Sequence, residues 1–286
     1  MTVYCLGSIN ADVTYRVARL ARPGETIVAQ EMRRGLGGKG ANQSVAAARA
    51  GARVVHIGTI GAEGDWCVAE LASYGVECRH VAQDAGPSGH AIIHVDAKGE
   101  NVITVFAGAN ARQDLARIEA ALGQAGPGDW LLLQNETSHQ QEAAQLAQAR
   151  GVRVAYSAAP FEAEELRRVL PYVSLLLLNE GEFAALGAAG IALPAACATL
   201  VTQGAAGAEW RQGETRLQQR GFVVEAVDST GAGDCFAGYV VAGLEAGRGP
   251  EEAMAIAAAA AALSVTRPGA AGAVPDRAEV EAFLSQ

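Results

Sequence analysis

The sequence has few residues of several kinds, and each shortage excludes a class of protein. Its five cysteines are scattered and form no Cys-x-x-Cys pair, which argues against a disulfide framework and a structural zinc site. The longest apolar run, Ala253–Leu263, is far shorter than the roughly 20 residues that span a bilayer. No basic region precedes an apolar stretch at the N-terminus, so no signal peptide is visible. We therefore expect a soluble, reduced protein of the cytoplasm.

Positive charge is also scarce. Lys and Arg total 22 against 31 Asp and Glu, a net charge of −9, which argues against general binding to nucleic acid or to an anionic membrane surface. Only two residues are lysines, and one of them, Lys39, lies within a cluster of glycines. A compact ammonium group differs chemically from a guanidinium group, so Lys39 is either a functional residue or an ordinary loop residue.

Short apolar runs alternate along the chain with alanine-rich segments. Continuous hydrophobicity is typical of strands buried on both faces of a parallel sheet, and the alternation predicts an α/β fold around a mostly parallel sheet. The predicted strands are Val3–Ile9, Val54–Ile60, Trp130–Gln134, Val152–Ala155, Leu175–Leu178, Ala198–Thr202 and Phe222–Val227. The predicted helices include Gln43–Ala50, Cys67–Tyr74, Gln140–Arg150 and Glu162–Val169.

Two stretches, residues 11–33 and 88–107, interrupt this alternation. The second has two β-rich runs around the turn Asp96-Ala97-Lys98-Gly99-Glu100, which is a hairpin signal. Strands that do not join the main sheet can form a small lid over its C-terminal edge. We find no linker or repeat, so we expect one domain over residues 1–286 that carries this lid.

The first glycine cluster is Gly35-Leu36-Gly37-Gly38-Lys39-Gly40-Ala41-Asn42-Gln43. It formally contains G-x-G-x-x-G, but the preceding residues make no buried strand, so a dinucleotide-binding Rossmann site is disfavoured. A Walker A loop needs Ser or Thr after Gly-Lys, where Gly40 stands. What the pattern favours is a glycine-rich turn that opens a helix and binds a polar ligand with free N–H groups. The alternative is a tight turn without a ligand.

The second cluster is Asp228-Ser229-Thr230-Gly231-Ala232-Gly233-Asp234. A helix that begins at Gly231-Ala232-Gly233 would offer N–H groups and a dipole to a phosphate. Asp234 would lie in its first turn, where it either stabilises the helix end or accepts a proton from an attacking hydroxyl group. We favour the second role because the acid lies beside the anion-binding turn.

Two further pairs of polar residues follow predicted strands. Asn179 and Glu182 come just after Leu175–Leu178 and can orient a hydrated metal near phosphates, or simply begin a helix. Asn10 and Asp12 follow the first strand and face the same way in extended backbone, which suits the hydroxyl groups of a sugar.

Taken together, the motifs resemble the PfkB carbohydrate kinase family, and the ribokinases among its members. Gly37-Gly38-Lys39-Gly40-Ala41-Asn42-Gln43 is similar to the N-terminal signature of the family, and Asp228–Asp234 to its C-terminal signature. Asn179-x-x-Glu182 resembles its motif for magnesium and phosphate. The resemblance covers essentially the whole chain. It implies a ribokinase-like three-layer sandwich with a β-sheet lid.

The resemblance also implies ATP-dependent phosphorylation of a sugar, with ribose converted to ribose 5-phosphate. The residues implied for the sugar are Asn10, Asp12, Gly38, Lys39, Asn42 and Glu136. Asp234 is implied as the base, with an anion hole made by Gly231, Ala232 and Gly233. The residues implied for ATP and Mg²⁺ are Asn179, Glu182, Thr202, Gly204 and Gly207.

Ribokinases also have a K⁺ loop beside the anion hole and often form homodimers through the lid, and the resemblance implies both here. The implied K⁺ ligands are Asp228 and the carbonyl groups of Thr230, Ser264, Arg267 and Gly269. Two positions depart from the ribokinase pattern. Ala273 stands where a serine commonly joins the cation site, and Ser157-Ala158-Ala159-Pro160 stands where Asn-Pro-Ala-Pro is common.

Three alternatives stay open. The first is a relative acting on another sugar or on a nucleoside. A nucleoside kinase would need apolar or aromatic lid residues to stack a base, and Ala11–Arg33 offers only Tyr15 among aromatics. A sugar sensor without catalysis would not need the intact Gly231-Ala232-Gly233-Asp234. A nicotinamide-dependent oxidoreductase is disfavoured by the misplaced glycine fingerprint.

Overall fold

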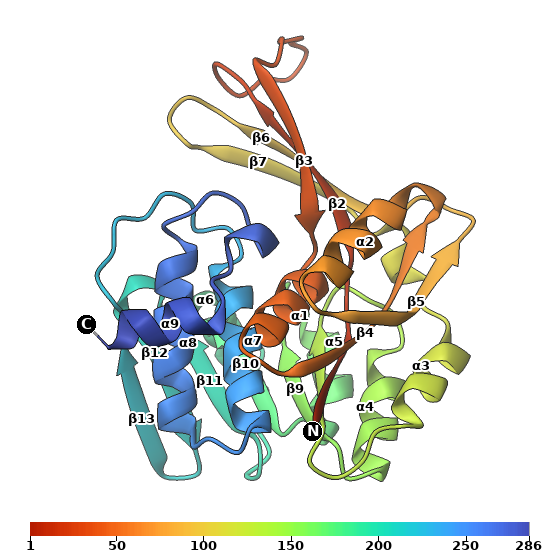
Figure 1. The fold of residues 1–286 in the computed structure, drawn as a ribbon, viewed down its shortest axis with the longest axis vertical. Coiled ribbons are helices and arrows are strands. Elements are labelled where there is room, and N and C mark those ends of the chain that lie inside the picture. The colour runs from red at the N-terminus through yellow and green to blue at the C-terminus, as the bar shows by residue number, and fades with distance from the viewer. Residues whose placement is uncertain (286) are drawn as a thin grey trace.

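The computed structural model describes residues 1–285 and has a nine-stranded sheet at its centre (Figure 1). The strand order is β13 (Thr215–Arg220), β12 (Gly207–Gln212), β11 (Ala198–Thr202), β10 (Leu175–Asn179), β9 (Arg153–Ser157), β8 (Trp130–Gln134), β1 (Thr2–Leu6), β4 (Arg53–Gly61) and β5 (Glu77–Asp84). All neighbours from β11 to β5 are parallel, and β12 and β13 are antiparallel additions at one edge. The prediction of a mostly parallel sheet is confirmed.

Each face of this sheet is covered by helices, which gives three layers. Side chains alternate along a strand: Val3 and Cys5 of β1 join one hydrophobic core, and Tyr4 and Leu6 join the other. The first core is covered by α1 (Lys39–Arg49), α2 (Asp65–Ser73), α7 (Ala232–Glu245), α8 (Pro250–Ser264) and α9 (Arg277–Leu284). The second is covered by α3 (Leu115–Leu122), α4 (Gln140–Ala149), α5 (Ala163–Val169) and α6 (Glu180–Ala188). Within residues 1–285, no helix is long and apolar enough to cross a membrane.

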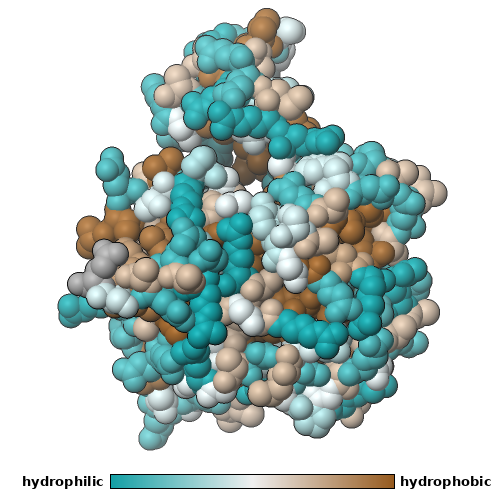
Figure 2. All heavy atoms as spheres, in the orientation of Figure 1, coloured by the Kyte–Doolittle hydropathy of each residue, from teal (hydrophilic) through white to brown (hydrophobic). Residues whose placement is uncertain are grey.

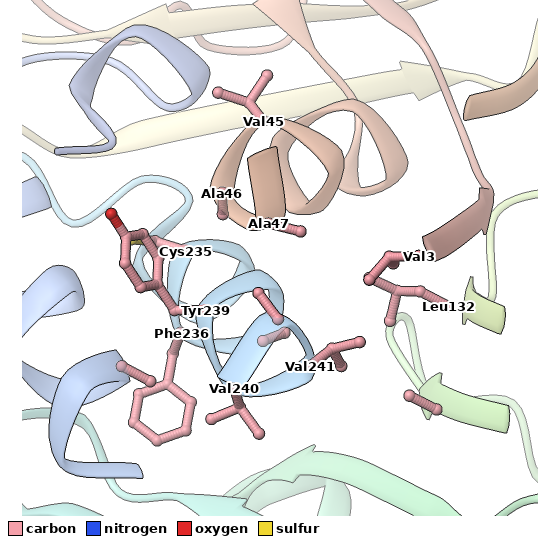
Figure 3. Packing of buried hydrophobic residues seen from close by; sticks show 14 of the residues in the cluster. Val3, Val45, Ala46, Ala47, Leu132, Cys235, Phe236, Tyr239, Val240 and Val241 are labelled. Atoms are coloured by element: carbon pink, nitrogen blue, oxygen red, sulfur yellow. The ribbon is translucent and has the colours of Figure 1, made fainter. Parts of the chain in front are cut away.

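Helices α1 and α7 pack closely because α7 has a glycine, Gly238, where it contacts α1. Figure 3 shows Ala46 and Ala47 of α1 facing Cys235 and Tyr239 of α7. A Cβ atom added to Gly238 would lie 2.5 Å from both the Ala46 Cβ and the Gln43 carbonyl oxygen. Only glycine therefore allows this approach. The close packing brings the N-terminal turns of the two helices, and hence both glycine clusters, into one site.

A second sheet projects from the body of the molecule (Figure 1). Its order is β3 (Glu31–Gly37), β2 (Asn10–Arg16), β6 (Gly89–Val95) and β7 (Asn101–Phe106). Strands β2 and β3 pair antiparallel, as do β6 and β7, so both predicted hairpins are confirmed; β2 and β6 pair in parallel. In Figure 2 this sheet stands out above the body, with hydrophobic residues among the hydrophilic ones on its surface.

The strand predicted over Phe222–Val227 is wrong. This segment is irregular, with Val223 fully exposed and Val227 65% exposed, so it cannot be a strand buried on both faces. Phe222 instead packs edge-on against Phe283 of α9. The edge of the sheet is β13, whose polar, alternating sequence does not stand out as a buried strand.

Candidate active site

A cavity of about 170 Å³ lies where the carboxyl ends of β10 and β11 meet the N-terminus of α7. Ligands bind at this edge of parallel sheets. The cavity brings together residues that are far apart in the sequence. Its polar and glycine lining includes Lys39, Ser157, Asn179, Glu182, Thr202, Ser229, Gly231, Gly233 and Asp234. It therefore joins the N-terminal glycine cluster, the C-terminal glycine cluster and the Asn179–Glu182 pair.

The Asp234 carboxylate is buried and held by two amides from α1. Asn42 Nδ2 donates to Asp234 Oδ2 at 3.0 Å, and Gln43 Nε2 donates to Asp234 Oδ1 at 2.9 Å. The two donors are neighbours at the start of α1, and Asp234 lies in the first turn of α7. Two donors, one to each carboxylate oxygen, hold the Asp234 side chain in one direction.

The N-terminus of α7 offers backbone N–H groups beside this carboxylate. The residue before the helix, Gly231, has φ +74°, and a Cβ atom there would lie 2.9 Å from the Ala270 Cβ, so glycine is required. The Ala232 N–H donates to the Ser229 carbonyl at 3.2 Å. Within residues 1–285, the N–H groups of Gly233 and Asp234 have no hydrogen-bond acceptor. An anion bound at the start of α7 would accept hydrogen bonds from these two N–H groups.

Lys39, the first residue of α1, lies among three carboxylates. The charge of Asp234 raises the pKa of the Lys39 ammonium against the opposite effect of burial, and Glu136 and Glu182 add to the increase. Glu136 is tied to the same turn, because the Ser8 hydroxyl donates to Glu136 Oε2 and the Lys39 N–H donates to it at 3.2 Å. Burial raises the pKa of Glu136. Lys39 is thus a charged side chain at the cavity rather than an ordinary loop residue.

Asn10 and Asp12 lie on β2 beside the glycine turn. Asp12 packs against Gly37, where a Cβ atom would lie 1.9 Å from Asp12 Oδ2. Asp12 Oδ1 and Asn42 Oδ1 are buried acceptors with no hydrogen-bond partner among residues 1–285. Asn10 Oδ1 accepts from Asn110 Nδ2 at 2.8 Å. Burial, with the charge of Glu136, raises the pKa of Asp12 to about 6. Unpartnered buried acceptors indicate a ligand that donates hydrogen bonds.

Asn179 and Glu182 begin α6 with a capping box. Asn179 Oδ1 accepts from the Glu182 N–H, and Glu182 Oε2 accepts from the Asn179 N–H, both at 2.8 Å. The reading as a helix start is therefore confirmed, and one oxygen of Glu182 stays available at the cavity. Burial raises the pKa of Glu182. Thr202 also lines the cavity, whereas Gly204, in the turn after β11, and Gly207, the first residue of β12, lie outside its lining.

Asp228 links two loops beside the anion-binding turn. Its Oδ1 accepts from the Thr230 N–H and its Oδ2 from the Gly269 N–H, each at 2.9 Å. Burial raises the pKa of Asp228, but these hydrogen bonds together lower it below its usual value. The Ser264 carbonyl accepts from the Arg267 N–H at 3.2 Å, and the Arg267 side chain pairs with Glu279. Within residues 1–285, no group of three or more His, Cys, Asp and Glu residues could hold a metal ion.

Several residues of the site escaped the sequence analysis. Ser8, Gln43, Gln134 and Asn110 are buried polar residues that hold the residues described above. Each acts through a partner at least 91 positions away in the sequence, as in the Gln134–Gln43 pair. Of these four residues, Gln43 could have been identified from the sequence, because it lies next to Asn42 in the first glycine cluster. Ser157 and Ala159, from the segment that departs from the ribokinase pattern, line the cavity.

Known proteins are similar to this chain in fold and in sequence. Residues 2–277 match the pfkB family of carbohydrate kinases. A ribokinase of Haemophilus influenzae is 36% identical over 306 residues, which cover 99% of this chain and 98% of the relative. The ribokinase structure from Thermotoga maritima superposes with a TM-score of 0.86 at 34% identity, over 100% of this chain and 99% of the other.

The structure of Arabidopsis thaliana ribokinase complexed with ribose and ATP superposes with a TM-score of 0.85 at 28% identity, over 99% of this chain and 98% of the other. These likenesses confirm the predicted ribokinase-like fold with its large sheet and small second sheet. A family match over nearly the whole chain also confirms the resemblance seen in the glycine motifs. This chain therefore belongs to the pfkB family of carbohydrate kinases.

Proposed function

We propose that this ATP-dependent carbohydrate kinase phosphorylates a hydroxymethyl group of a small sugar, with ribose as the preferred substrate and ribose 5-phosphate as the product. One observation carries the proposal. The Asp234 carboxylate lies between the N–H groups at the start of α7 and the Asn42 and Lys39 side chains of α1. A base is thus placed beside a site for a phosphate on one side and polar groups for a sugar on the other.

In the proposed reaction, Asp234 accepts the proton of the sugar hydroxyl group. The oxygen of that hydroxyl group forms a bond to the γ-phosphorus of ATP. The bond from that phosphorus to the bridging oxygen breaks, and ADP leaves. The N–H groups of Gly233 and Asp234 would bind the phosphoryl oxygens, with the rest of the proposed Gly231-Ala232-Gly233 turn behind them. General-base help is typically worth about 10²–10⁴ in rate, and one donor of such an anion hole about 10²–10³.

The polar groups around β2 support a sugar as the acceptor. Asp12 Oδ1 and Asn42 Oδ1 lack hydrogen-bond donors among the described residues, and both suit the hydroxyl groups of a polyol. Asn10, Gly38, Lys39 and Glu136 are the other residues we assign to the sugar. A nucleoside is the alternative acceptor, but Tyr15 already stacks on His94 with ring centroids 5.7 Å apart, which leaves no free aromatic ring on β2 for a base.

The nucleotide and its Mg²⁺ would be held at the other end of the cavity. We assign Asn179, Glu182, Thr202, Gly204 and Gly207 to this role. The free oxygen of Glu182 suits Mg²⁺, which keeps several waters and takes one or two carboxylates together with phosphate oxygens. The chemistry that Mg²⁺ supplies there is neutralisation of the charge on the β- and γ-phosphates.

A monovalent cation would bind in the loop held by Asp228, with Thr230, Ser264, Arg267 and Gly269 as the other proposed ligands. Ala273 supplies no hydroxyl, and both Asp228 oxygens already accept N–H groups. We therefore expect K⁺ to activate turnover less than it activates a ribokinase with serine at this position. A titration of initial rates with KCl, at ionic strength held constant with tetramethylammonium chloride, measures the effect. Ala273→Ser should increase the activation, and strong activation of the unaltered chain would contradict the expectation.

The substrate assignment is tested with a panel of acceptors. ATP is supplied with ribose, deoxyribose, fructose or adenosine, and ADP release is measured in a coupled assay. We expect the highest kcat/KM with ribose. Preference for adenosine would support the nucleoside alternative. Binding of ribose without ADP release would support the alternative of a sugar sensor that has lost catalysis.

We also propose that the second sheet acts as a lid and as the contact between two copies in a homodimer. Its strand β7 is exposed along its whole length, including Val102, Val105 and Phe106. Exposed apolar strands at a sheet edge favour pairing with another chain. Sedimentation should give about twice the 29.3 kDa mass of the chain, and a monomer at micromolar concentration would reject the dimer.

A further inference from the structure

We propose that Gln43 and Gln134 are positioning residues that fix the direction of the Asp234 carboxylate, an inference that rests on the proposed role of Asp234 as base. The three side chains form a continuous chain of hydrogen bonds. Gln134 Nε2 donates to Gln43 Oε1 at 2.8 Å, and Gln43 Nε2 donates to Asp234 Oδ1 at 2.9 Å. Both glutamines are completely buried. This chain of hydrogen bonds supplies a partner to both polar atoms of Gln43, whereas Gln134 Oε1 has none among the described residues.

The direction of each amide follows from the charged end of the chain. The Asp234 carboxylate only accepts hydrogen bonds, so Gln43 must present its NH₂ group to it. The Gln43 oxygen then faces Gln134, which must in turn present its own NH₂ group. Rotating either amide by half a turn would place two donors or two acceptors face to face, without water to relieve them. The carboxylate is thereby held by a partner that has a single allowed orientation.

The backbone leaves room for this chain of hydrogen bonds at its Gln134 end. A Cβ atom on Gly7 would lie 2.5 Å from Gln134 Oε1, so the glycine after β1 gives the amide its space. Gln134 is the last residue of β8, which pairs with β1. The chain of hydrogen bonds therefore connects Asp234 on α7 to the end of a central strand of the large sheet. A base that must keep one direction benefits from such an anchor.

Gln43 and Asn42 hold the carboxylate in different ways. Asn42 has an unpartnered oxygen, Oδ1, among the described residues and is available to a sugar. Both polar atoms of Gln43 are already used inside the protein. Sugar binding can therefore rearrange the Asn42 side and leave the Gln43 side unchanged. We infer that Gln43 holds Asp234 Oδ1 and leaves Oδ2 to accept the proton.

The test uses Gln43→Glu and Gln43→Met in the full-length enzyme with ATP and ribose. Gln43→Glu keeps the shape and still accepts from Gln134, but it faces Asp234 with an acceptor. Gln43→Met keeps the length and removes both polar groups. We expect kcat to fall by about 10- to 100-fold in each variant, as for a misplaced catalytic group, with the sugar KM changed by less than about threefold. The control is Gln140→Met, at a buried glutamine that does not belong to this chain of hydrogen bonds. We expect it to keep kcat.

Two further measurements separate a positioning role from a general loss of structure. The ¹⁵N-labelled Gln43 side-chain NH₂ resonance should shift in Asp234→Asn. In that same background, Gln43→Met should have little further effect on kcat. If either Gln43 variant is unfolded by circular dichroism, Gln134→Met tests the chain without touching Asp234, and we expect a smaller fall in kcat. The proposal is overturned if a folded variant keeps kcat within about twofold or if the two effects on kcat are additive.

The outcomes also distinguish this inference from the proposed function. Normal turnover of Asp234→Asn by itself would reject Asp234 as base. Loss of turnover in Asp234→Asn together with normal turnover in Gln43→Met and Gln134→Met would keep the base and reject the positioning role.

Discussion

Asp234→Asn should lower kcat by about 10²–10⁴ with little effect on sugar binding, because it removes the proposed general base and keeps the shape of the side chain. The two donors around Asp234 favour a well-placed substitution. The Gln43 amide cannot rotate by half a turn without losing the hydrogen bond that Gln134 donates to it. The new amide at position 234 would therefore present its oxygen to Gln43. Its NH₂ group would face Asn42, whose free oxygen can turn to accept it. The fold should therefore tolerate the change.

The measurement is steady-state kinetics with ATP and ribose, with sugar affinity obtained separately by calorimetry. Glu245→Gln is a matched control, since Glu245 is a buried carboxylate at the other end of the same helix. It contacts only the N-terminal amine, at 3.6 Å, among the ion pairs of residues 1–285, and we expect its kcat to be normal. Near-normal turnover of Asp234→Asn would show that another group accepts the proton.

Asp12→Ala should chiefly weaken the binding of the sugar. The change removes a buried acceptor that has no protein partner for Oδ1 within residues 1–285. A hydrogen bond to a charged group contributes about 1.5–3 kcal/mol, so we expect the sugar KM to rise about 10- to 100-fold. The kcat at saturating sugar should fall much less. An unchanged sugar KM would remove Asp12 from the sugar site.

The raised pKa of Asp12 also gives a dependence on pH. Its value of about 6 in the folded protein lies above the usual 3.8. Between about pH 4 and pH 6, Asp12 therefore keeps its proton in the folded chain and has lost it in the unfolded chain. Stability from this group is present below about pH 4 and is lost as pH rises through about 6. Hydroxyl groups of a sugar donate to the ionised form, so the sugar KM should rise as pH falls below about 6. Asp12→Asn should abolish this dependence, and a KM of the parent enzyme that is flat from pH 5 to 7 would contradict it.

The sequence predicted the parts of the fold that depend on local pattern. Continuous apolar runs such as Leu175–Leu178 identified central strands, and the hairpin of β6 and β7 was identified by its turn. The hairpin of β12 and β13 was missed because Thr215–Arg220 alternates between polar residues and one leucine, without the apolar run of a buried strand. Phe222–Val227 failed for the opposite reason. Phe222 packs against α9 past the sheet edge, and Val223 and Val227 are exposed, so the apolar residues there do not reflect strand pairing.

The sequence predicted the charged and glycine-rich parts of the site better than its amides. Lys39 and Asp234 lie in glycine clusters whose backbone geometry follows from short-range rules. Gln43 and Gln134 carry no charge, and glutamines are common on protein surfaces. Their importance depends on a contact between residues 91 positions apart, which no local pattern encodes. Likewise, the capping box showed that Asn179 and Glu182 stabilise a helix start, which the sequence alone had left undecided.

Two of the connections between the second sheet and the body are a single residue long. Only Gly38 separates β3 from α1, and only Ala107 separates β7 from the next turn of helix, Gly108–Ala111. A tilt of the projecting sheet therefore cannot be absorbed by a loose loop and must reach the first residues of α1. Those residues include Lys39 and Asn42, so we expect a movement of the sheet to change the distance between the proposed sugar site and Asp234. Under the proposed function, we therefore expect sugar binding on β2 and alignment for phosphoryl transfer to be coupled.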